Sequence, residues 1–246
     1  IDPEVWLQTT TGTEKQQAQA TFVTKFLDIY ENSFTKEPPN LDYVEPTVEA
    51  PVLSLNDIII LSQKGQELSW EDFDKFSYIE TGSGLYIRVY KINPGFSLWI
   101  GGGGPGREPM YISLRTNTGP EDSIDIRTES VTDFISRHRD DYLNAVIADA
   151  VLKEYGNDRI STGEFPCESH EILATEGGDP AGSNQTGAVT VYALVLYQRY
   201  TYFNGELTES GGSYIPTALT FDISASGEYT LTEYWIPRDG SYYADD

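Results

Sequence analysis

Residues 140–155 read Asp140-Asp-Tyr-Leu-Asn-Ala-Val-Ile-Ala-Asp-Ala-Val-Leu-Lys-Glu-Tyr155, and this stretch decides the expected fold of the C-terminal half. Acidic residues at its start favour the positive end of a helix dipole, and Gly156 follows as a helix stop. Apolar side chains recur at helical spacing, at Leu143, Ile147, Ala150, Val151 and Tyr155. The stretch therefore predicts an amphipathic helix that needs a surface to cover its apolar face.

Four strand candidates that follow this helix supply that surface. They are rich in β-branched and aromatic residues and span residues 168–175, 188–202, 214–224 and 229–237. Asn204-Gly205 and Ser226-Gly227 are turn signals between them. One helix followed by a four-stranded meander predicts a helix laid across a curved antiparallel sheet, as in cystatin-like or NTF2-like folds.

The middle of the chain predicts a second antiparallel sheet. Asn93-Pro94-Gly95 is a tight-turn sequence, because Pro presets φ and Gly accepts positive φ, so the flanking strands are expected to be hairpin neighbours. Short helices are expected from Ser69 to about residue 76 and over 129–138, where Val131, Phe134, Ile135 and His138 form a stripe. The strand candidates are residues 57–62, 85–92, 96–100, 110–115 and 123–127.

The N-terminal part differs in composition from the rest. Thr13 and Gln16 form a capping box that predicts a helix over 13–32, and four prolines between 35 and 51 predict an extended linker. The expected organisation is an α+β protein in three parts: 1–51, an N-terminal helix and Pro-rich linker; 52–139, an antiparallel-sheet domain with helices; and 140–246, a helix with a four-stranded antiparallel sheet. The length of 246 residues with 39% hydrophobic content allows a core without disulfides.

Charge and composition exclude one class of partner. The net charge is −23, and from Asp140 onward 18 Asp/Glu stand against 4 Lys/Arg. The chain has no stripe of basic residues that could contact a phosphate backbone, so nucleic acid is not an expected partner.

The single Cys is compatible with a reducing cytosol and with a bacterial surface that has few disulfides, and it does not distinguish between the two compartments. The chain opens Ile1-Asp-Pro3, ends Asp245-Asp246 and has its single Met at position 110, so it is expected to be an excised fragment. It has no basic-apolar leader and no apolar run near 18 residues, so any targeting or membrane segment is expected outside this sequence.

Two short motifs invite a catalytic interpretation. The glycine-rich run 101–106 lacks the Lys-Ser/Thr ending of a phosphate loop and leads into a strand, so it predicts a mobile hairpin tip. Ser33-Phe-Thr-Lys36 has the Ser-x-x-Lys spacing of penicillin-recognising serine enzymes. No Lys-Thr-Gly follows it, and Pro38-Pro39 stands beside it, so coincidence is the favoured explanation.

Metal-binding and carboxylate chemistry have little support. His170-Glu171 is not followed by a second His four residues on, and His138 is the only other His, so no metal and no cofactor are expected. Glu164, Glu168 and Glu171 would serve acid catalysis if they approached one another, but a solvated face is favoured in so acidic a chain. Cys167, beside a carboxylate that would raise its pKa, is expected to be buried and inert.

Aromatic residues crowd the C-terminal strands. They would line a ligand groove or pack across strands, and cross-strand packing is favoured; they are Tyr192, Tyr197, Tyr200, Tyr202, Tyr214, Tyr229, Tyr234 and Trp235. The end of the last strand combines polar and aromatic groups that suit ligand binding, although Asp239-Gly240 is equally an ordinary turn. The candidate binding residues are Tyr234, Trp235, Arg238, Asp239, Tyr242 and Tyr243.

Several segments resemble one known family. Ala188-Val-Thr-Val-Tyr-Ala-Leu-Val-Leu-Tyr197, with residues 211–221 and 229–243, resembles the C-terminal extracytoplasmic tail of BlaR/MecR-type antirepressor membrane metallopeptidases from Firmicutes. Residues 55–64, 68–73 and 96–101 resemble another part of such a tail. In that family a membrane-embedded zinc protease performs the chemistry, and an outward-facing region senses the inducer. The chain lacks the protease's His-Glu-x-x-His motif and the Lys-Thr-Gly of the β-lactam sensor.

The resemblance and the missing catalytic groups predict a non-enzymatic, extracytoplasmic sensory or interaction module at the cell surface, with a membrane-anchored parent. Its partner would be an unidentified small molecule, a peptide or a cell-wall component. Two alternatives remain. A carboxylate-dependent hydrolase would show a concave cluster drawn from Glu164, Glu168, Glu171, Glu233 and Asp239, and a structural spacer would show a closed surface without a pocket.

Overall fold

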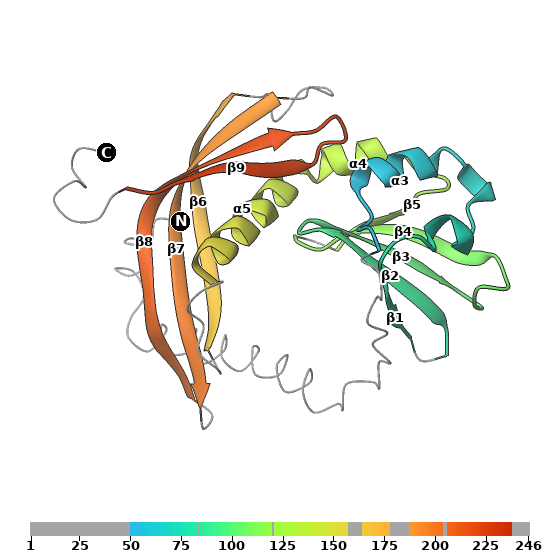
Figure 1. The fold of residues 1–246 in the computed structure, drawn as a ribbon, viewed down its shortest axis with the longest axis horizontal. Helices are drawn as coiled ribbons and strands as arrows, with labels where there is room; N and C mark the ends of the chain where they lie inside the picture. The colour runs from blue at the N-terminus through green and yellow to red at the C-terminus, as the bar shows by residue number, and fades with distance from the viewer. Residues whose placement is uncertain are drawn as a thin grey trace. The chain divides into compact units, whose positions relative to one another are not determined.

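The computed structural model describes residues 50–82, 84–119, 121–156, 164–177, 187–203 and 206–237 (Figure 1). Backbone contacts divide the chain into residues 1–44 and 45–246, and all that follows concerns the second unit. The helix predicted over 13–32, the Ser33–Lys36 motif, all but the last two residues of the predicted linker and the Asn204-Gly205 turn lie outside the described residues.

The described residues form a mixed helix and sheet protein, as predicted, with two antiparallel sheets. The first sheet has the order β1-β2-β3-β4-β5, with β1 Ile79–Thr81, β2 Tyr86–Asn93, β3 Phe96–Gly102, β4 Pro109–Thr116 and β5 Ser123–Asp125. The second sheet has the order β6-β7-β8-β9, with β6 Glu164–Gly177, β7 Gly187–Phe203, β8 Glu206–Ile223 and β9 Tyr229–Trp235. The helices are α3 Leu55–Ser62, α4 Val131–Arg137 and α5 Arg139–Gly156, with 3-10 turns η1 Gly65–Glu67 and η2 Trp70–Phe73.

The strand predicted at 57–62 is wrong, because this segment forms helix α3. Ser54 caps the helix: its hydroxyl accepts the Asp57 N–H at 3.1 Å, and the Asp57 carboxylate accepts the Ser54 N–H at 3.1 Å. This reciprocal pair satisfies two backbone donors at the helix start. Leu55 and Ile58 then fall on one helical face and are fully buried. Capping and burial outweigh the strand preference of three consecutive isoleucines.

The other short helices lie near their predicted places. Ser69 begins the segment predicted from residue 69, in a capping box with Asp72, but only the 3-10 turn η2 forms. Helix α4 starts after Ser130, whose hydroxyl accepts the Asp133 N–H, and ends at Arg137, with His138 as its C-cap. Its predicted apolar stripe is buried at Val131, Phe134 and Ile135. Strand β1 was not predicted, and its three residues are exposed.

The first sheet confirms the predicted hairpin. Strands β2 and β3 pair across Asn93-Pro94-Gly95, and the Asn93 Oδ1 accepts the N–H groups of Gly95 and Phe96, both at 3.0 Å. The glycine-rich run also joins paired strands, because Gly101 and Gly102 complete β3 and β4 begins at Pro109. The predicted hairpin at this position is therefore confirmed.

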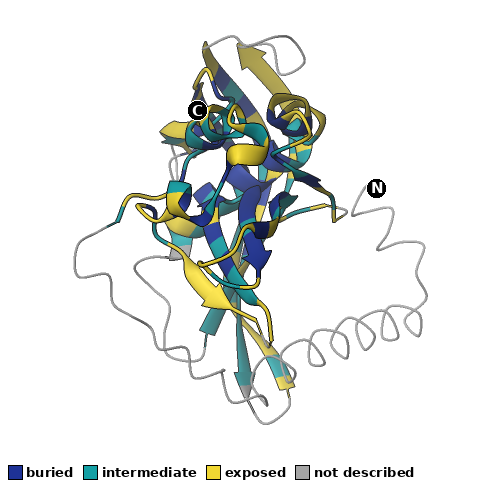
Figure 2. Cartoon of the chain, turned by 90° about the vertical axis from the view of Figure 1, so that its right-hand side faces the viewer, coloured by how far each residue is buried: buried dark blue, intermediate teal, exposed yellow. Residues whose placement is uncertain are grey.

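The second sheet confirms the predicted meander and its helix. Strands β6 to β9 pair in sequence order, and α5 packs against β6, β7 and β9, lying across the curved strands in Figure 1. Strands β6 and β8 begin earlier than predicted, at Glu164 and Glu206. The buried side chains of α5 include Tyr142, Ile147 and Val151. Buried segments, dark blue in Figure 2, are found on the helices and on the strands of both sheets.

One hydrophobic core continues from the first sheet to the second. The Tyr142 ring on α5 makes edge contacts with Phe96 at 5.1 Å and with Tyr229 at 5.2 Å between ring centroids. The Leu55 N–H donates to Glu228 Oε1 at 3.0 Å. The Tyr142–Phe96 and Leu55–Glu228 contacts cross the boundary predicted between residues 139 and 140. The division into two domains stays a prediction, and it must accommodate this shared core.

Candidate functional site

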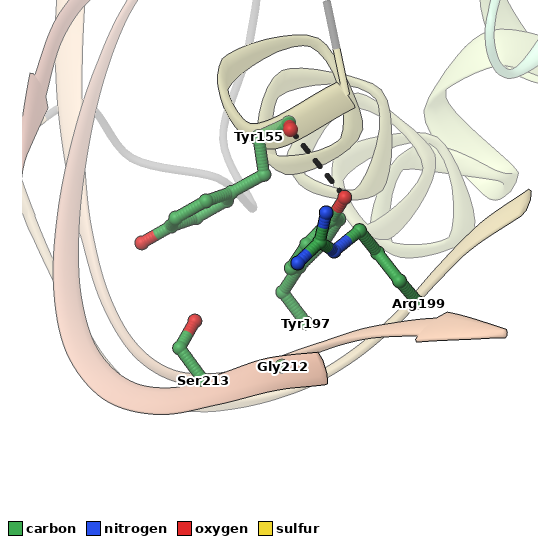
Figure 3. A pocket seen from close by; sticks show the side chains of 5 residues that line it. All are labelled: Tyr155, Tyr197, Arg199, Gly212 and Ser213. Atoms are coloured by element: carbon green, nitrogen blue, oxygen red, sulfur yellow. Dashed lines mark hydrogen bonds between the residues drawn. The ribbon is translucent and has the colours of Figure 1, made fainter. Parts of the chain in front are cut away.

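A small hollow opens on the inner face of the second sheet, beside the last turn of α5. Its volume is about 180 Å³, and Figure 3 shows the residues that line it: Tyr155, Tyr197, Arg199, Gly212 and Ser213. We call it the Arg199 hollow. Helix α5 contributes Tyr155, β7 contributes Tyr197 and Arg199, and β8 contributes Gly212 and Ser213.

Strand periodicity places these groups on one face. Tyr197 and Arg199 are two residues apart on β7, so their side chains point to the same side of the sheet. Ser213 lies opposite Tyr197 in the β7–β8 register, and Gly211 lies opposite Arg199. A bulge follows, because Tyr200 pairs with Glu209 and leaves Ser210 as an extra residue. Gly211, at φ +147, sits at this bulge.

Two tyrosine rings form one wall of the Arg199 hollow. The rings of Tyr155 and Tyr197 stack with centroids 4.8 Å apart and an interplanar angle of 22°. The Tyr197 hydroxyl donates to the Tyr155 carbonyl oxygen at 3.4 Å, the dashed line in Figure 3. Tyr234 on β9 meets Tyr155 edge-on at 6.5 Å. Burial, with Tyr155 nearby, raises the pKa of Tyr234, so this phenol is neutral at physiological pH.

Arg199 brings the charge into the hollow. It is the only Lys or Arg in the described residues of β6 to β9. Its Nη1 lies 3.9 Å from Glu164 Oε2, and the two side chains are 28% and 15% exposed. Its Nη2 lies above Gly211, where a Cβ would approach it to 3.0 Å. The glycine therefore makes the space in which the guanidinium lies.

Ser213 completes the lining with a polar group. Its Oγ is buried and has no hydrogen-bond partner among the described residues. Figure 3 shows this hydroxyl directed from β8 toward the hollow. Buried side-chain hydroxyls are nearly always paired, because an unpaired one loses its bonds to water without replacement. Ser213 therefore adds to the lining a polar group that has no hydrogen-bond partner among the described residues.

The residues predicted for binding are only partly described. Tyr234 and Trp235 are neighbours on β9, so their side chains point to opposite faces of the sheet. Tyr234 contacts the tyrosine wall of the hollow, whereas Trp235 is 38% exposed. Arg238, Asp239, Tyr242 and Tyr243 lie outside the described residues. Binding by the six residues together stays a prediction.

The aromatic residues of the second sheet divide between its faces. Tyr197 and Tyr229 are buried, whereas Tyr192 and Tyr214 are exposed at 41% and 55%. Cross-strand packing is present, because the rings of Phe165 and Tyr200 stack at 6.0 Å. The eight aromatic residues therefore do not line one groove.

Three of the five carboxylates named for the hydrolase alternative, Glu164, Glu168 and Glu171, do not gather on β6, and Asp239 lies outside the described residues. Glu164 and Glu168 are four residues apart on β6, a separation of about 13 Å along a strand. Glu171 is exposed, and strand alternation directs it to the opposite face. Glu168 Oε2 lies 3.0 Å from His170 Nδ1, and His170 Nε2 lies 3.0 Å from Asn144 Oδ1 on α5. Within the described part of the chain, no three His, Cys, Asp or Glu side chains are arranged to hold a metal ion.

Cys167 corrects a further expectation. The prediction that it is buried is wrong, because the thiol lies on the exposed face of β6. The even-numbered residues Pro166, Glu168 and His170 face inward, so Cys167 faces outward. Partial desolvation raises the pKa of the thiol, and the expected direction therefore holds for a different reason.

Sequence reasoning missed the main elements of the Arg199 hollow. Two features of the sequence could have indicated it: Arg199 is the only Lys or Arg between Arg159 and Arg238, and Gly211-Gly212 interrupts a predicted strand.

Comparison with protein-family models, curated proteins and solved structures gave no match. The resemblance to BlaR/MecR-type tails therefore stays a prediction. None of the helices described is long and apolar enough to cross a membrane.

Proposed function

We propose that this chain is a non-enzymatic sensory or interaction module that binds a small anionic ligand in the Arg199 hollow. The observation that carries the proposal is the buried Ser213 hydroxyl, which has no partner among the described residues and is directed into a hollow that also holds Arg199. A ligand there would complete the hydrogen bonding of Ser213 and meet the positive charge of Arg199.

The lining defines the chemistry of the ligand. A carboxylate suits Arg199, because a guanidinium binds carboxylates through paired N–H donors. A flat or apolar body suits the stacked rings of Tyr155 and Tyr197. The volume of about 180 Å³ equals roughly six water molecules at their share of the liquid, so the ligand is small.

The architecture fits this proposal. We infer a cystatin-like or NTF2-like arrangement from the single helix α5 laid over the four-stranded meander. In the described residues the hollow lies on the helix-covered face, where a curved sheet and a helix leave a concave space.

The proposed setting is the extracytoplasmic part of a membrane-bound regulatory protein of the BlaR/MecR type. Two of the segments that carry the resemblance, 188–197 and 211–221, lie on β7 and β8 and include three residues of the hollow, Tyr197, Gly212 and Ser213. The resemblance and the hollow thus concern the same part of the chain. The hydrolase alternative gains no support from the separated positions of Glu164, Glu168 and Glu171, and the spacer alternative does not explain the hollow.

The test is an NMR titration of the whole chain with benzoate and with its neutral isostere benzamide. We expect benzoate to shift the amide resonances of Tyr155, Arg199 and Ser213, with a dissociation constant near the millimolar range that is normal for so small a probe. Benzamide should bind at least tenfold more weakly, and Arg199→Gln should remove the difference. Arg137→Gln, which removes an exposed charge on α4, is the matched control and should retain it. Equal binding of both probes by the wild-type chain would refute the proposal.

A second test concerns the non-acylating part of the proposal. Incubation with a fluorescent penicillin should leave the chain unlabelled, because the Ser33 motif has no accompanying Lys-Thr-Gly. Stoichiometric covalent label on Ser33 would show that the chain is an acylated sensor.

A further inference from the structure

The first sheet has a second face, opposite its core, with its own chemistry. Tyr90, Leu98 and Ile112 point into the core, and alternation along the strands directs their neighbours the other way. Six residues define this surface, which we call the Trp99 face: Lys91, Ser97, Trp99, Tyr111, Ser113 and Arg115. Ser97 pairs with Lys91 on one side and Arg115 on the other, and Trp99 pairs with Ser113.

Small residues allow the aromatic rings to lie close to the sheet. A Cβ at Gly101 would meet the Tyr111 ring at 2.2 Å, so the phenol covers this glycine. Ser97 and Ser113 are 7% and 8% exposed beneath the larger side chains. The Trp99 Nε1–H donates to Ser97 Oγ at 3.2 Å. The rings are therefore held in place before any partner arrives.

Positive charge accompanies these rings. The Arg115 guanidinium lies 4.5 Å from the Trp99 ring centroid and 6.0 Å from that of Tyr111. Its Nε is buried without a hydrogen-bond partner, and neither Arg115 nor Lys91 forms an ion pair among the described residues. Asp125, on the neighbouring strand, is bound by Arg127 at 2.6 Å. In a chain of charge −23, this face therefore has two cations whose charge no described carboxylate neutralises.

We propose that the Trp99 face binds an anionic glycan, a chain of sugar rings that bear carboxylates. A pyranose ring offers a flat C–H face to Trp99 and Tyr111, and its carboxylate pairs with Arg115 or Lys91. A peptide added as a strand is disfavoured here, because β3 already has β2 and β4 on its two sides and has no free edge. Long-range repulsion from the acidic chain is screened over about 8 Å at physiological salt, so the local contacts decide binding.

The test is calorimetric titration of the whole chain with oligogalacturonate of six units. Neutral maltohexaose and hexaglutamate are the comparison probes. We expect oligogalacturonate to bind at least tenfold more tightly than either one. Arg115→Gln and Trp99→Ala should each weaken binding about tenfold, whereas Lys153→Gln, which removes one charge on α5, should change it less than twofold. Circular dichroism shows whether a variant is folded, and Lys91→Gln, at an exposed position, is a second variant that should weaken binding without affecting the fold.

Each other outcome overturns the proposal. Equal binding of maltohexaose would show that charge is not read, and equal binding of hexaglutamate with the same sensitivity to Arg115→Gln would assign the face to an acidic polypeptide. Absence of oligogalacturonate binding, or self-association abolished by Trp99→Ala, would show that no glycan occupies this face. The benzoate titration probes the Arg199 hollow on the second sheet, whereas the Trp99 face belongs to the first sheet. A failure of the glycan proposal therefore does not refute the proposed ligand site in the Arg199 hollow.

Discussion

The Ser213 hydroxyl provides the sharpest prediction, because a binding residue and a stabilising residue respond oppositely to its removal. An unpaired buried hydroxyl costs a folded protein about 1–3 kcal/mol. The Ser213 Oγ is buried with no partner among the described residues, so Ser213→Ala removes this cost. The small void left by one oxygen offsets part of the gain. We expect the free energy of unfolding to rise by about 1 kcal/mol, which corresponds to an increase in Tm of about 2–4 °C.

The assay is equilibrium unfolding in urea, with the m-value checked for constancy so that the shift in midpoint reports stability. Ser224→Ala is the matched control, since Ser224 Oγ is 2.8 Å from Ser226 Oγ and accepts the Glu228 N–H at 3.0 Å. That variant should lose about 0.5–1.5 kcal/mol. Ser213→Ala should also weaken benzoate binding. If Ser213→Ala destabilises the chain as much as Ser224→Ala does, the hydroxyl is already satisfied and the reasoning fails.

Three further predictions concern the same framework. His170→Ala should cost about 2–3 kcal/mol in urea unfolding, because it leaves the Glu168 carboxylate, 10% exposed, without its partner; an unchanged midpoint would refute this. Gly212→Ala should cost about 1–3 kcal/mol and shift the amide signals of β7 and β8, since its Cβ would meet the Tyr197 carbonyl oxygen at 2.5 Å; an unshifted spectrum would contradict that. Burial raises the pKa of Tyr90 to about 12 from the ordinary 10, against the opposing effect of Arg88, so as pH rises this phenol ionises in the unfolded chain before it ionises in the folded one. Its contribution, about 2 kcal/mol, is complete below pH 10 and is lost as pH rises toward 12; Tyr90→Phe should flatten this decline, and an equal decline in the variant would disprove the assignment.

Local sequence signals predicted most of the second sheet. The apolar spacing from Leu143 to Tyr155 indicated a helix, and the four strands were long enough for their β-branched and aromatic composition to identify them as strands. The error at 57–62 shows the limit of composition, because the capping pair of Ser54 and Asp57 decides the helix and three isoleucines point the other way. Residues with a strong strand preference adopt a helix when a capping pair and a buried face at helical spacing both favour the helix.

The Arg199 hollow was not predictable in the same way. Its geometry depends on the register that sets Ser213 opposite Tyr197 and on the bulge beside Gly211, and both are details of the β7–β8 pairing that strand composition does not determine. The unpaired state of the Ser213 hydroxyl is visible only after packing is known. The predicted burial of Cys167 failed for the related reason that strand phase on β6 was unknown.

The most direct measurement is a crystal structure of the chain soaked with 4-bromobenzoate, in which bromine locates the ligand by anomalous scattering. We expect a bromine peak beside the Tyr155 and Tyr197 rings, with the carboxylate within hydrogen-bond distance of Arg199 and Ser213. A peak confined to other surfaces, or an Arg199 hollow that holds no ligand while Ser213 Oγ bonds to the protein, would contradict it.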